Sequence, residues 1–155
     1  MAAGKSTVAR ALGRRLDWRV EDIDDRIEAR EGRSVASIFA RDGEAYFRAI
    51  ERSVLVDLLP LRHAVVATGG GTFVDPENRA VINRDGLSVW LDVPLSELIR
   101  RLPADGRRPL AADREQLERL YAMRSLAYQQ AALHLDAGTT PVDGLVEQVL
   151  DAIAR

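Results

Sequence analysis

Four apolar residues, Ala64 to Ala67, run almost directly into three consecutive glycines, Gly69 to Gly71. A short, uninterrupted apolar run is typical of a strand buried on both faces, as in the interior of a parallel sheet. Such a strand needs helices above and below it. The glycines that follow would let a backbone approach a ligand closely and offer N–H groups to it. A flexible turn is the alternative, although turns rarely require three glycines in a row.

The rest of the chain supplies the helices and strands that such a sheet needs. The apolar pattern predicts helices at residues 5–16, 23–30, 34–41, 44–59, 76–84, 94–102, 114–132 and 142–153, and strands at residues 18–22, 64–67, 87–91 and 133–136. Because strands alternate with helices, we expect an α/β fold with a parallel sheet covered on both faces. Ligands bind at the carboxyl ends of such strands. Asp22, Asp24, the three glycines and Gly138 should therefore converge at one edge.

Composition limits what such a fold could do. A chain of 155 residues is most simply one domain, and its net charge of −2 gives no reason to expect a nucleic-acid partner. It contains no cysteine, which excludes disulfides and thiolate metal sites. No apolar stretch approaches the ~20 residues of a membrane span, and charges recur from Lys5 onward, so neither a membrane partner nor a signal peptide is expected. We expect a cytoplasmic protein.

The fragment Gly4-Lys5-Ser6-Thr7 matches the second half of a phosphate-binding loop, G-x-x-x-x-G-K-[ST]. In such a loop, N–H groups at the start of a helix bind phosphate, the lysine neutralises it, and the hydroxyl of Ser6 would hold Mg²⁺. The first glycine and the preceding strand of such a loop are missing ahead of Gly4. The alternative is that Ser6 or Thr7 merely caps a helix.

Two carboxylates, Asp22 and Asp24, follow the predicted strand at residues 18–22. Carboxylates placed there can bind Mg²⁺ through water or accept a proton from an attacking hydroxyl. The alternative is that they are acids favoured at a helix N-terminus by the helix dipole. Taken alone, this pair favours the second interpretation.

Arginines provide a further set of candidates: Arg48, Arg101, Arg107, Arg108 and Arg124. A single arginine is usually solvated surface. Arg107 and Arg108 differ from the others because they lie in the one long irregular stretch, residues 103–113, where a mobile lid is expected. We place this lid at about residues 103–115.

Together these segments resemble the motifs of the shikimate kinases, over essentially the whole chain. The family carries, in order, a phosphate-binding loop, D-x-D after the second strand, F-R-x-x-E, G-G-G, a lid R-P-L and R-x-P-x-Y. The counterparts here are residues 1–7, Asp22 to Asp24, Phe47 to Glu51, Gly69 to Gly71, Arg108 to Leu110, and Arg124 to Tyr128. Six ordered motifs at compatible spacings argue against a chance match.

The resemblance implies a single domain, residues 1–155, with a three-layer P-loop kinase fold. Its parallel sheet would have the family's strand order 2-3-1-4-5, with the first strand absent from this chain, and helices on both faces. The implied activity is the transfer of a phosphoryl group from ATP to the 3-hydroxyl of shikimate, a step of aromatic amino-acid synthesis. The implied cofactors are ATP and Mg²⁺, and the implied protein is a monomer.

The resemblance also implies a role for each matching residue. Lys5 would bind phosphate, Asp24 would hold the shikimate hydroxyls and orient or deprotonate the nucleophile, and Arg108 would close onto the transferred group. Ser6 and Asp22 would hold Mg²⁺. The substrate site would comprise Asp24, Arg48, Gly69, Gly70, Gly71 and Arg124, with the two arginines on the carboxylate. The nucleotide site would comprise Ala2, Ala3, Gly4, Lys5, Ser6, Thr7, Arg101, Arg108, Gly138 and Thr139.

Three features depart from the family pattern. The first strand and first glycine are absent, Leu126 stands where the family has proline, and the lid is a few residues short. We expect that Met1 is not the natural start of the protein. Two other functions stay open: a non-catalytic ligand-sensing domain like that of some transcription regulators, and a related small-molecule kinase such as a gluconate kinase. Arg48, Arg124 and the triple glycine favour shikimate over gluconate.

Overall fold

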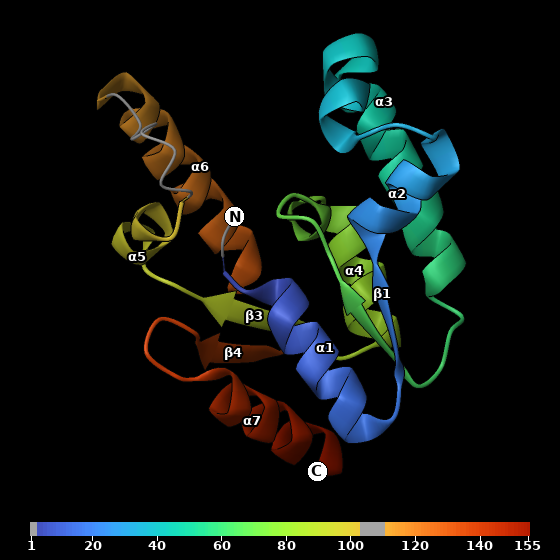
Figure 1. The fold of residues 1–155 in the computed structure, drawn as a ribbon, viewed down its shortest axis with the longest axis vertical. Helices are drawn as coiled ribbons and strands as arrows, with labels where there is room; N and C mark the ends of the chain where they lie inside the picture. Colours follow the sequence, from blue (N-terminus) through green and yellow to red (C-terminus); the bar gives the residue numbers. More distant parts are fainter. Residues whose placement is uncertain (1–2, 103–110) are drawn as a thin grey trace.

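The chain forms four short parallel strands in two separate pairs (Figure 1). This computed structural model describes residues 3–102 and 111–155, apart from the side chains of residues 111 and 112. β1 (Arg19–Asp22) pairs with β2 (Ala64–Ala67), and β3 (Val89–Asp92) pairs with β4 (Leu133–Asp136). In register, Arg19 lies opposite Ala64 and Val89 lies opposite Leu133. The parallel α/β fold is confirmed, and the two pairs are those that remain of order 2-3-1-4-5 without its first strand.

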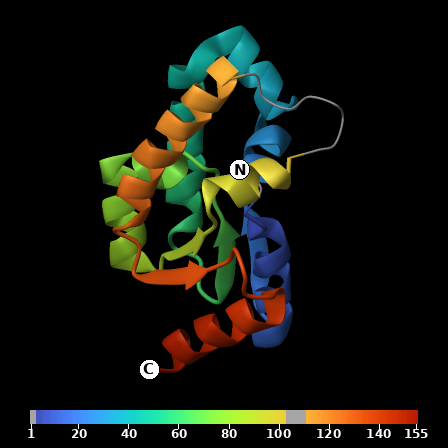
Figure 2. The same ribbon diagram turned by 90° about the vertical axis from the view of Figure 1, so that its left-hand side faces the viewer.

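Helices cover both faces of these strands (Figures 1 and 2). On one face α1 (Lys5–Leu16) packs against β2 and against α7 (Val142–Ala154), which also contacts β4. On the other face lie α4 (Pro76–Asp85) and α6 (Ala111–Tyr128). A separate helix pair, α2 (Ile23–Glu31) and α3 (Val35–Leu58), follows β1, and α5 (Leu95–Arg100) follows β3. Among the described residues, no helix combines the length and apolarity needed to cross a membrane.

Side-chain caps fix the start of α3 and of α4. Ser34 precedes α3 and accepts a hydrogen bond from the Ser37 N–H at 3.1 Å. Asp75 precedes α4 and accepts from the Glu77 N–H at 2.8 Å, and Pro76 occupies the first helical position. The turn η1 (Thr72–Val74) connects the glycines to this cap.

The largest differences from the predicted helices concern α3 and α6. The helices expected at residues 34–41 and 44–59 form the single run α3, broken only at Gly43, whose φ of 83° favours glycine. α6 begins at Ala111 rather than at residue 114 and ends at Tyr128 rather than at residue 132. Its end is set by tighter turns, in which the Gln130 and Ala131 N–H groups bond to carbonyls three residues earlier.

The apolar core consists of two clusters. One joins α1, β4 and α7 with the segment after β3, and its buried members include Leu12, Val93, Leu135 and Val149. The other joins α2 and α3. The expectation that β2 is buried on both faces is met only at Ala67, because Ala64, Val65 and Val66 are partly exposed.

Candidate active site

The first part of the site is the start of α1. Gly4 precedes this helix with a left-handed φ of 86°, and no side chain caps it. The prediction that Ser6 or Thr7 merely caps a helix is therefore wrong, and the first-turn N–H groups are available to an anion. The Lys5 ammonium donates to the Thr68 carbonyl at 2.7 Å, which ties this helix start to the end of β2. Ala2 lies outside the described residues.

The two aspartates of the D-x-D motif have different surroundings. Asp22 caps α2 by accepting from the Asp25 N–H at 3.2 Å, so the capping interpretation holds for this residue. Asp24 is half-buried, and its Oδ1 is buried without a hydrogen-bond partner among the described residues. Burial, together with the neighbouring Asp22 carboxylate, raises the pKa of Asp24. Burial lowers the pKa of Lys5, although both aspartates oppose that shift. Asp24 is therefore the better candidate to receive a proton.

The triple glycine meets three charged side chains in succession. A Cβ on Gly69 would lie 3.3 Å from Oδ1 of Asp24. A Cβ on Gly70 would lie 3.1 Å from Cζ of Arg124, and one on Gly71 would lie 2.7 Å from Cζ of Arg48. Each glycine thus leaves room for one charged group, which is the physical reason for three glycines in a row. The predicted convergence is confirmed for Asp24 and the triple glycine, whereas a Cβ on Gly138 would meet only Pro94 and Asp136.

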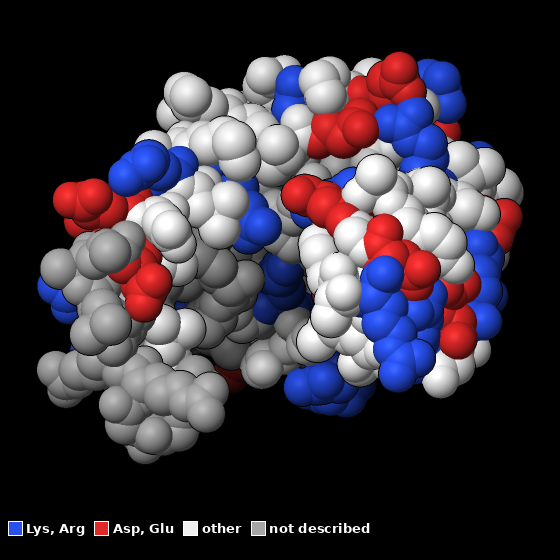
Figure 3. Space-filling model, turned by 90° about the horizontal axis from the view of Figure 1, so that it is seen from above, with Lys and Arg blue, Asp and Glu red and all other residues white. Residues whose placement is uncertain are grey.

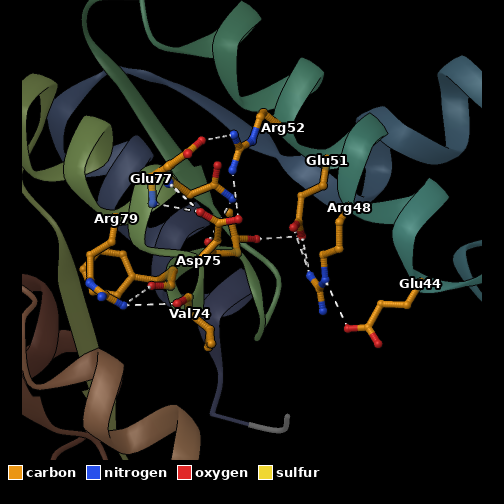
Figure 4. Close-up of polar contacts among 11 residues, drawn as sticks. Glu44, Arg48, Glu51, Arg52, Val74, Asp75, Glu77 and Arg79 are labelled. Carbon is orange, nitrogen blue, oxygen red and sulfur yellow. Dashed lines mark hydrogen bonds and ion pairs between the residues drawn. The ribbon is translucent and has the colours of Figure 1, made fainter.

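Arg48 is held from the α3 side by a buried carboxylate (Figure 4). Its Nη1 donates to both oxygens of Glu51, at 2.9 and 3.1 Å, and Glu51 is 1% exposed. Thr72, directly after the glycines, donates its hydroxyl to Glu51 at 2.9 Å. The Asn78 side chain in turn donates to the Thr72 carbonyl at 3.1 Å. This network links α3, η1 and α4 and sets the position of the guanidinium.

The same close-up shows a second set of contacts around Asp75. Arg52 donates to Asp75 at 2.8 Å and also pairs with Glu77. Arg79 donates to the Phe73 and Val74 carbonyls at 3.2 Å. These contacts fix the turn that carries the glycines to α4.

Arg124 reaches the glycines from α6 and is held less tightly. Within the described part of the chain, its guanidinium forms no hydrogen bond or ion pair. One turn later, the Tyr128 hydroxyl donates to the Gly70 carbonyl, and burial raises the pKa of this tyrosine. The hydrogen bond anchors the glycine loop to α6 while leaving Arg124 unpaired.

Sequence reasoning gave no role to Glu51, Thr72 or Tyr128. Glu51 could have been found, because it lies three residues after Arg48 on a helix and so on the same face. Tyr128 closes the segment that matches the family motif R-x-P-x-Y, which could have marked it, whereas Thr72 acts through a contact with a distant segment, for which the sequence holds no signal.

Of the predicted nucleotide residues outside α1, Arg101 lies against the loop that follows β4. Arg101, at the end of α5, donates to the Ala137 carbonyl at 3.2 Å and to Glu97 at 3.1 Å. The loop after β4 is closed by Asp136, which accepts from the Gly138 N–H at 3.0 Å and the Thr139 hydroxyl at 2.8 Å. Arg101 therefore contacts the residue directly before Gly138, and the assignment of this loop to the nucleotide stays a prediction. Of the lid predicted at about residues 103–115, residues 103–110, with Arg108, lie outside the described residues, and residues 111–115 belong to the start of α6.

The oxygen donors present suit a magnesium ion held mainly by water and phosphate. Ser6 is exposed in the first turn of α1, and Asp22 lies close enough to Lys5 to influence its charge. Within the described residues, no group of three or more His, Cys, Asp or Glu side chains forms a metal cage. Mg²⁺ typically binds through one or two protein oxygens plus substrate phosphates, so this donor set fits.

From above, the α2–α3 side and the α6 side flank a hollow (Figure 3). Lys and Arg atoms lie on its inner surface, whereas the outer surface of the α2–α3 side carries acidic and basic atoms side by side. A hollow with basic walls suits an anionic ligand.

Comparison with known proteins agrees with this geometry. A family model described as shikimate kinase matches residues 1–154. A shikimate kinase from Synechococcus elongatus is 41% identical, over 99% of this chain and 82% of its own length. One from Caulobacter vibrioides is also 41% identical, over 100% of this chain and 79% of its own length.

Solved structures give the same result. The crystal structure of shikimate kinase from Aquifex aeolicus aligns with a TM-score of 0.89 at 31% identity, covering 99% of this chain and 92% of that one. Shikimate kinase from Acinetobacter baumannii, in complex with shikimate, also aligns with a TM-score of 0.89, at 30% identity, covering 99% of this chain and 88% of that one. Ordered motifs, shared fold and nearly full coverage agree, and the chain belongs to the shikimate kinase family.

Proposed function

We propose that this protein transfers the γ-phosphoryl group of ATP to the 3-hydroxyl of shikimate, giving shikimate 3-phosphate and ADP. The observation that carries the proposal is the convergence of Arg48, Arg124 and Asp24 on the triple glycine. A small polyhydroxy acid needs cations for its carboxylate and a carboxylate for its hydroxyls, and this site offers both. The related Acinetobacter baumannii enzyme was solved in complex with shikimate.

Substrate recognition follows from the chemistry of these groups. The two guanidinium groups would bind the shikimate carboxylate, since their planar N–H donors match two carboxylate oxygens. The backbone of Gly70 would contact the substrate where a side chain would block it. Asp24 would accept hydrogen bonds from ring hydroxyls.

Asp24 is also the group best placed to handle the proton. In the reaction the 3-hydroxyl oxygen forms a bond to the γ-phosphorus as the bond to the bridging oxygen of ADP breaks, and the hydroxyl proton passes to Oδ1 of Asp24. The raised pKa of Asp24 makes it a better acceptor than an ordinary aspartate at neutral pH. Lys5 and the N–H groups of α1 would bind the phosphates.

The nucleotide and the metal ion would bind next to the shikimate site. Ser6 and Asp22 would hold Mg²⁺, which when bound neutralises phosphate charge. Arg101 and the loop at residues 137–141 would line the base pocket. Arg108, assigned only by resemblance, would complete the charge around the transferred group. We also propose a cytoplasmic location, where ATP is available, and a monomeric state, as the family resemblance implies.

A coupled assay for shikimate-dependent ADP formation tests the proposal. Asp24→Asn should lower kcat by about 10²- to 10⁴-fold, the usual contribution of a positioned acid or base. Asp25→Asn, at the exposed neighbouring position, is the matched control and should retain full activity. Full turnover in Asp24→Asn would refute the assignment. Turnover of gluconate but not shikimate would show a different kinase, and binding of a metabolite without turnover would show a sensor domain.

A further inference from the structure

The carbonyl groups of the glycine loop do not all have the same kind of hydrogen-bond partner. Those of Gly69 and Gly71 accept from backbone N–H groups three residues further along the chain, at 3.3 and 3.2 Å. The Gly70 carbonyl lies between them and accepts from the Tyr128 hydroxyl, with no backbone donor among the described residues. A side chain of α6 therefore supplies the partner that the loop's own backbone does not.

Arg124 reaches the same glycine from the same helix. A Cβ on Gly70 would lie 3.1 Å from Cζ of Arg124 and 3.7 Å from its Nη2. Arg124 and Tyr128 are four residues apart on α6, so their side chains share one face of the helix and approach the loop from the same side. A guanidinium forms stronger, charge-assisted hydrogen bonds than a neutral hydroxyl does. Without the Tyr128 hydroxyl, the Gly70 carbonyl would therefore attract Arg124.

Tyr128 can hold this carbonyl because aromatic contacts fix its ring. The ring centroid lies 5.9 Å from that of Trp90 on β3, with 53° between the planes, and Trp90 packs edge-on against His134. A tyrosine has few side-chain torsions, so a ring already fixed loses little freedom when its hydroxyl forms a hydrogen bond. An arginine loses much more rotamer freedom in forming one. The fixed hydroxyl therefore prevails over the stronger but more flexible donor of Arg124.

We propose that Tyr128 is a positioning residue, which keeps Arg124 available for the substrate carboxylate by occupying the Gly70 carbonyl. Glu51 positions Arg48 by binding it, whereas Tyr128 would act on Arg124 by removing a competing acceptor. Burial raises the pKa of Tyr128, although both arginines oppose that shift, so the hydroxyl keeps the proton that it donates. The inference rests on the proposed function, because it assigns the available guanidinium to shikimate.

The variant Tyr128→Phe tests the proposal, because it removes the hydroxyl and keeps the ring. Titration with shikimate should give a Kd about tenfold higher than that of the parent, the loss expected when one charged hydrogen bond is given up. Tyr121→Phe is the matched control, since the Tyr121 hydroxyl donates from the same helix to a different carbonyl, that of Val93, at 2.9 Å. Its Kd should stay within about twofold of the parent value. An unchanged Kd in Tyr128→Phe, or equal weakening in both variants, would overturn the proposal.

A double-mutant cycle separates this role from a purely structural one. If Tyr128 acts through Arg124, adding Tyr128→Phe to the Arg124→Met variant should change the Kd for shikimate by less than about twofold. If Tyr128 only anchors the glycine loop, its removal should weaken binding by the same factor whether or not Arg124 is present. That additive result would contradict the proposal.

The state of Arg124 can also be measured without substrate. Nitrogen-15 NMR reports how fast a guanidinium rotates about its Nε–Cζ bond, and the Arg124 signal is the one that Arg124→Met removes. In Tyr128→Phe this rotation should be roughly tenfold slower than in the parent, because the guanidinium is then bound to the Gly70 carbonyl. Equal rates would overturn the proposal. Slower rotation in Tyr128→Phe, with a parent that does not bind shikimate, would support the role of Tyr128 and refute the proposed function instead.

Discussion

The two sides of the glycine loop hold their arginines in different ways. On the α3 side, Arg48 is fixed by Glu51, a carboxylate that is 1% exposed and also receives the hydroxyl of Thr72. On the α6 side, Arg124 forms no hydrogen bond with any described residue. The two guanidinium groups approach neighbouring glycines, yet only Arg48 has its position set before a ligand arrives.

The difference suggests a division of labour in binding the substrate carboxylate. A group held in place loses little freedom on binding and therefore contributes to affinity and orientation. An unpaired group can move to meet the substrate and loses more freedom when it does. We expect Arg48 to set where the carboxylate lies and Arg124 to adjust to it. Variants of the two sides should therefore have unequal effects on stability.

The largest difference in the free energy of unfolding should be between the variants Arg48→Met and Arg124→Met. Removing Arg48 leaves the buried Glu51 carboxylate without its cation, which should lower the free energy of unfolding by about 3 kcal/mol, at the low end for a broken buried pair because Arg48 is partly exposed. Removing Arg124 breaks no ion pair, so the change should stay within about 0.5 kcal/mol. Urea unfolding of both variants measures the difference. Equal losses would show that Arg124 has a structural partner.

The second-largest effect should come from adding a methyl group to the glycine loop, which should destabilise the Arg48 side more than the Arg124 side. In Gly71→Ala the new Cβ meets Arg48, which Glu51 prevents from moving away, and overpacking should cost about 1–3 kcal/mol. In Gly70→Ala the new Cβ meets Arg124, which can turn aside. This variant should keep most of its stability but bind shikimate more weakly. Thermal unfolding and titration with shikimate test the pair, and a Gly70→Ala variant as unstable as Gly71→Ala would contradict the proposed freedom of Arg124.

Much of the fold could be predicted because the deciding signals are local. The spacing of Val8, Leu12 and Leu16 gives the bounds of α1, and the run from Leu133 to Asp136 gives those of β4. Asp75 and Pro76 fix the start of α4 for the same reason. A parallel arrangement then brings Asp24 and the glycines to one edge of the sheet, whereas the place of Arg48 and Arg124 beside them was implied only by the family resemblance.

What the sequence could not provide is which charged groups are paired and how deeply they are buried. Glu44 and Glu51 both lie on the Arg48 face of α3, but Glu44 is exposed and 3.5 Å from Arg48, whereas Glu51 is buried. Burial of Glu51 depends on Thr72, which comes from a separate segment. The division of the sheet into two pairs, by contrast, follows from the absence of the family's first strand, which the resemblance already implied.

A smaller effect should follow from Glu51→Gln. Glutamine keeps the size of the side chain and an oxygen for Arg48, but it removes the negative charge that fixes the guanidinium. Arg48 should then become as adaptable as Arg124, and KM for shikimate should rise by about tenfold, or roughly 1.4 kcal/mol, with a smaller change in kcat. Steady-state kinetics with Glu44→Gln as the exposed control would check this. An unchanged KM would show that Glu51 serves only stability.

The smallest effect concerns Asp24, which meets the first glycine of the loop. Burial and the Asp22 carboxylate raise the pKa of Asp24 in the folded protein above the ordinary value of about 3.9. Between those two pKa values the folded state binds more protons than the unfolded state, so the free energy of unfolding falls as pH rises through this window.

Asp24→Asn removes the ionisable group and should be more stable than the parent at pH 7. Its advantage should shrink as the pH is lowered through the raised pKa and vanish below the ordinary one, whereas Asp25→Asn should follow the parent throughout. Urea unfolding at a series of pH values measures the trend, and a variant less stable than the parent at neutral pH would mean that attraction to Lys5 outweighs the cost of burying Asp24.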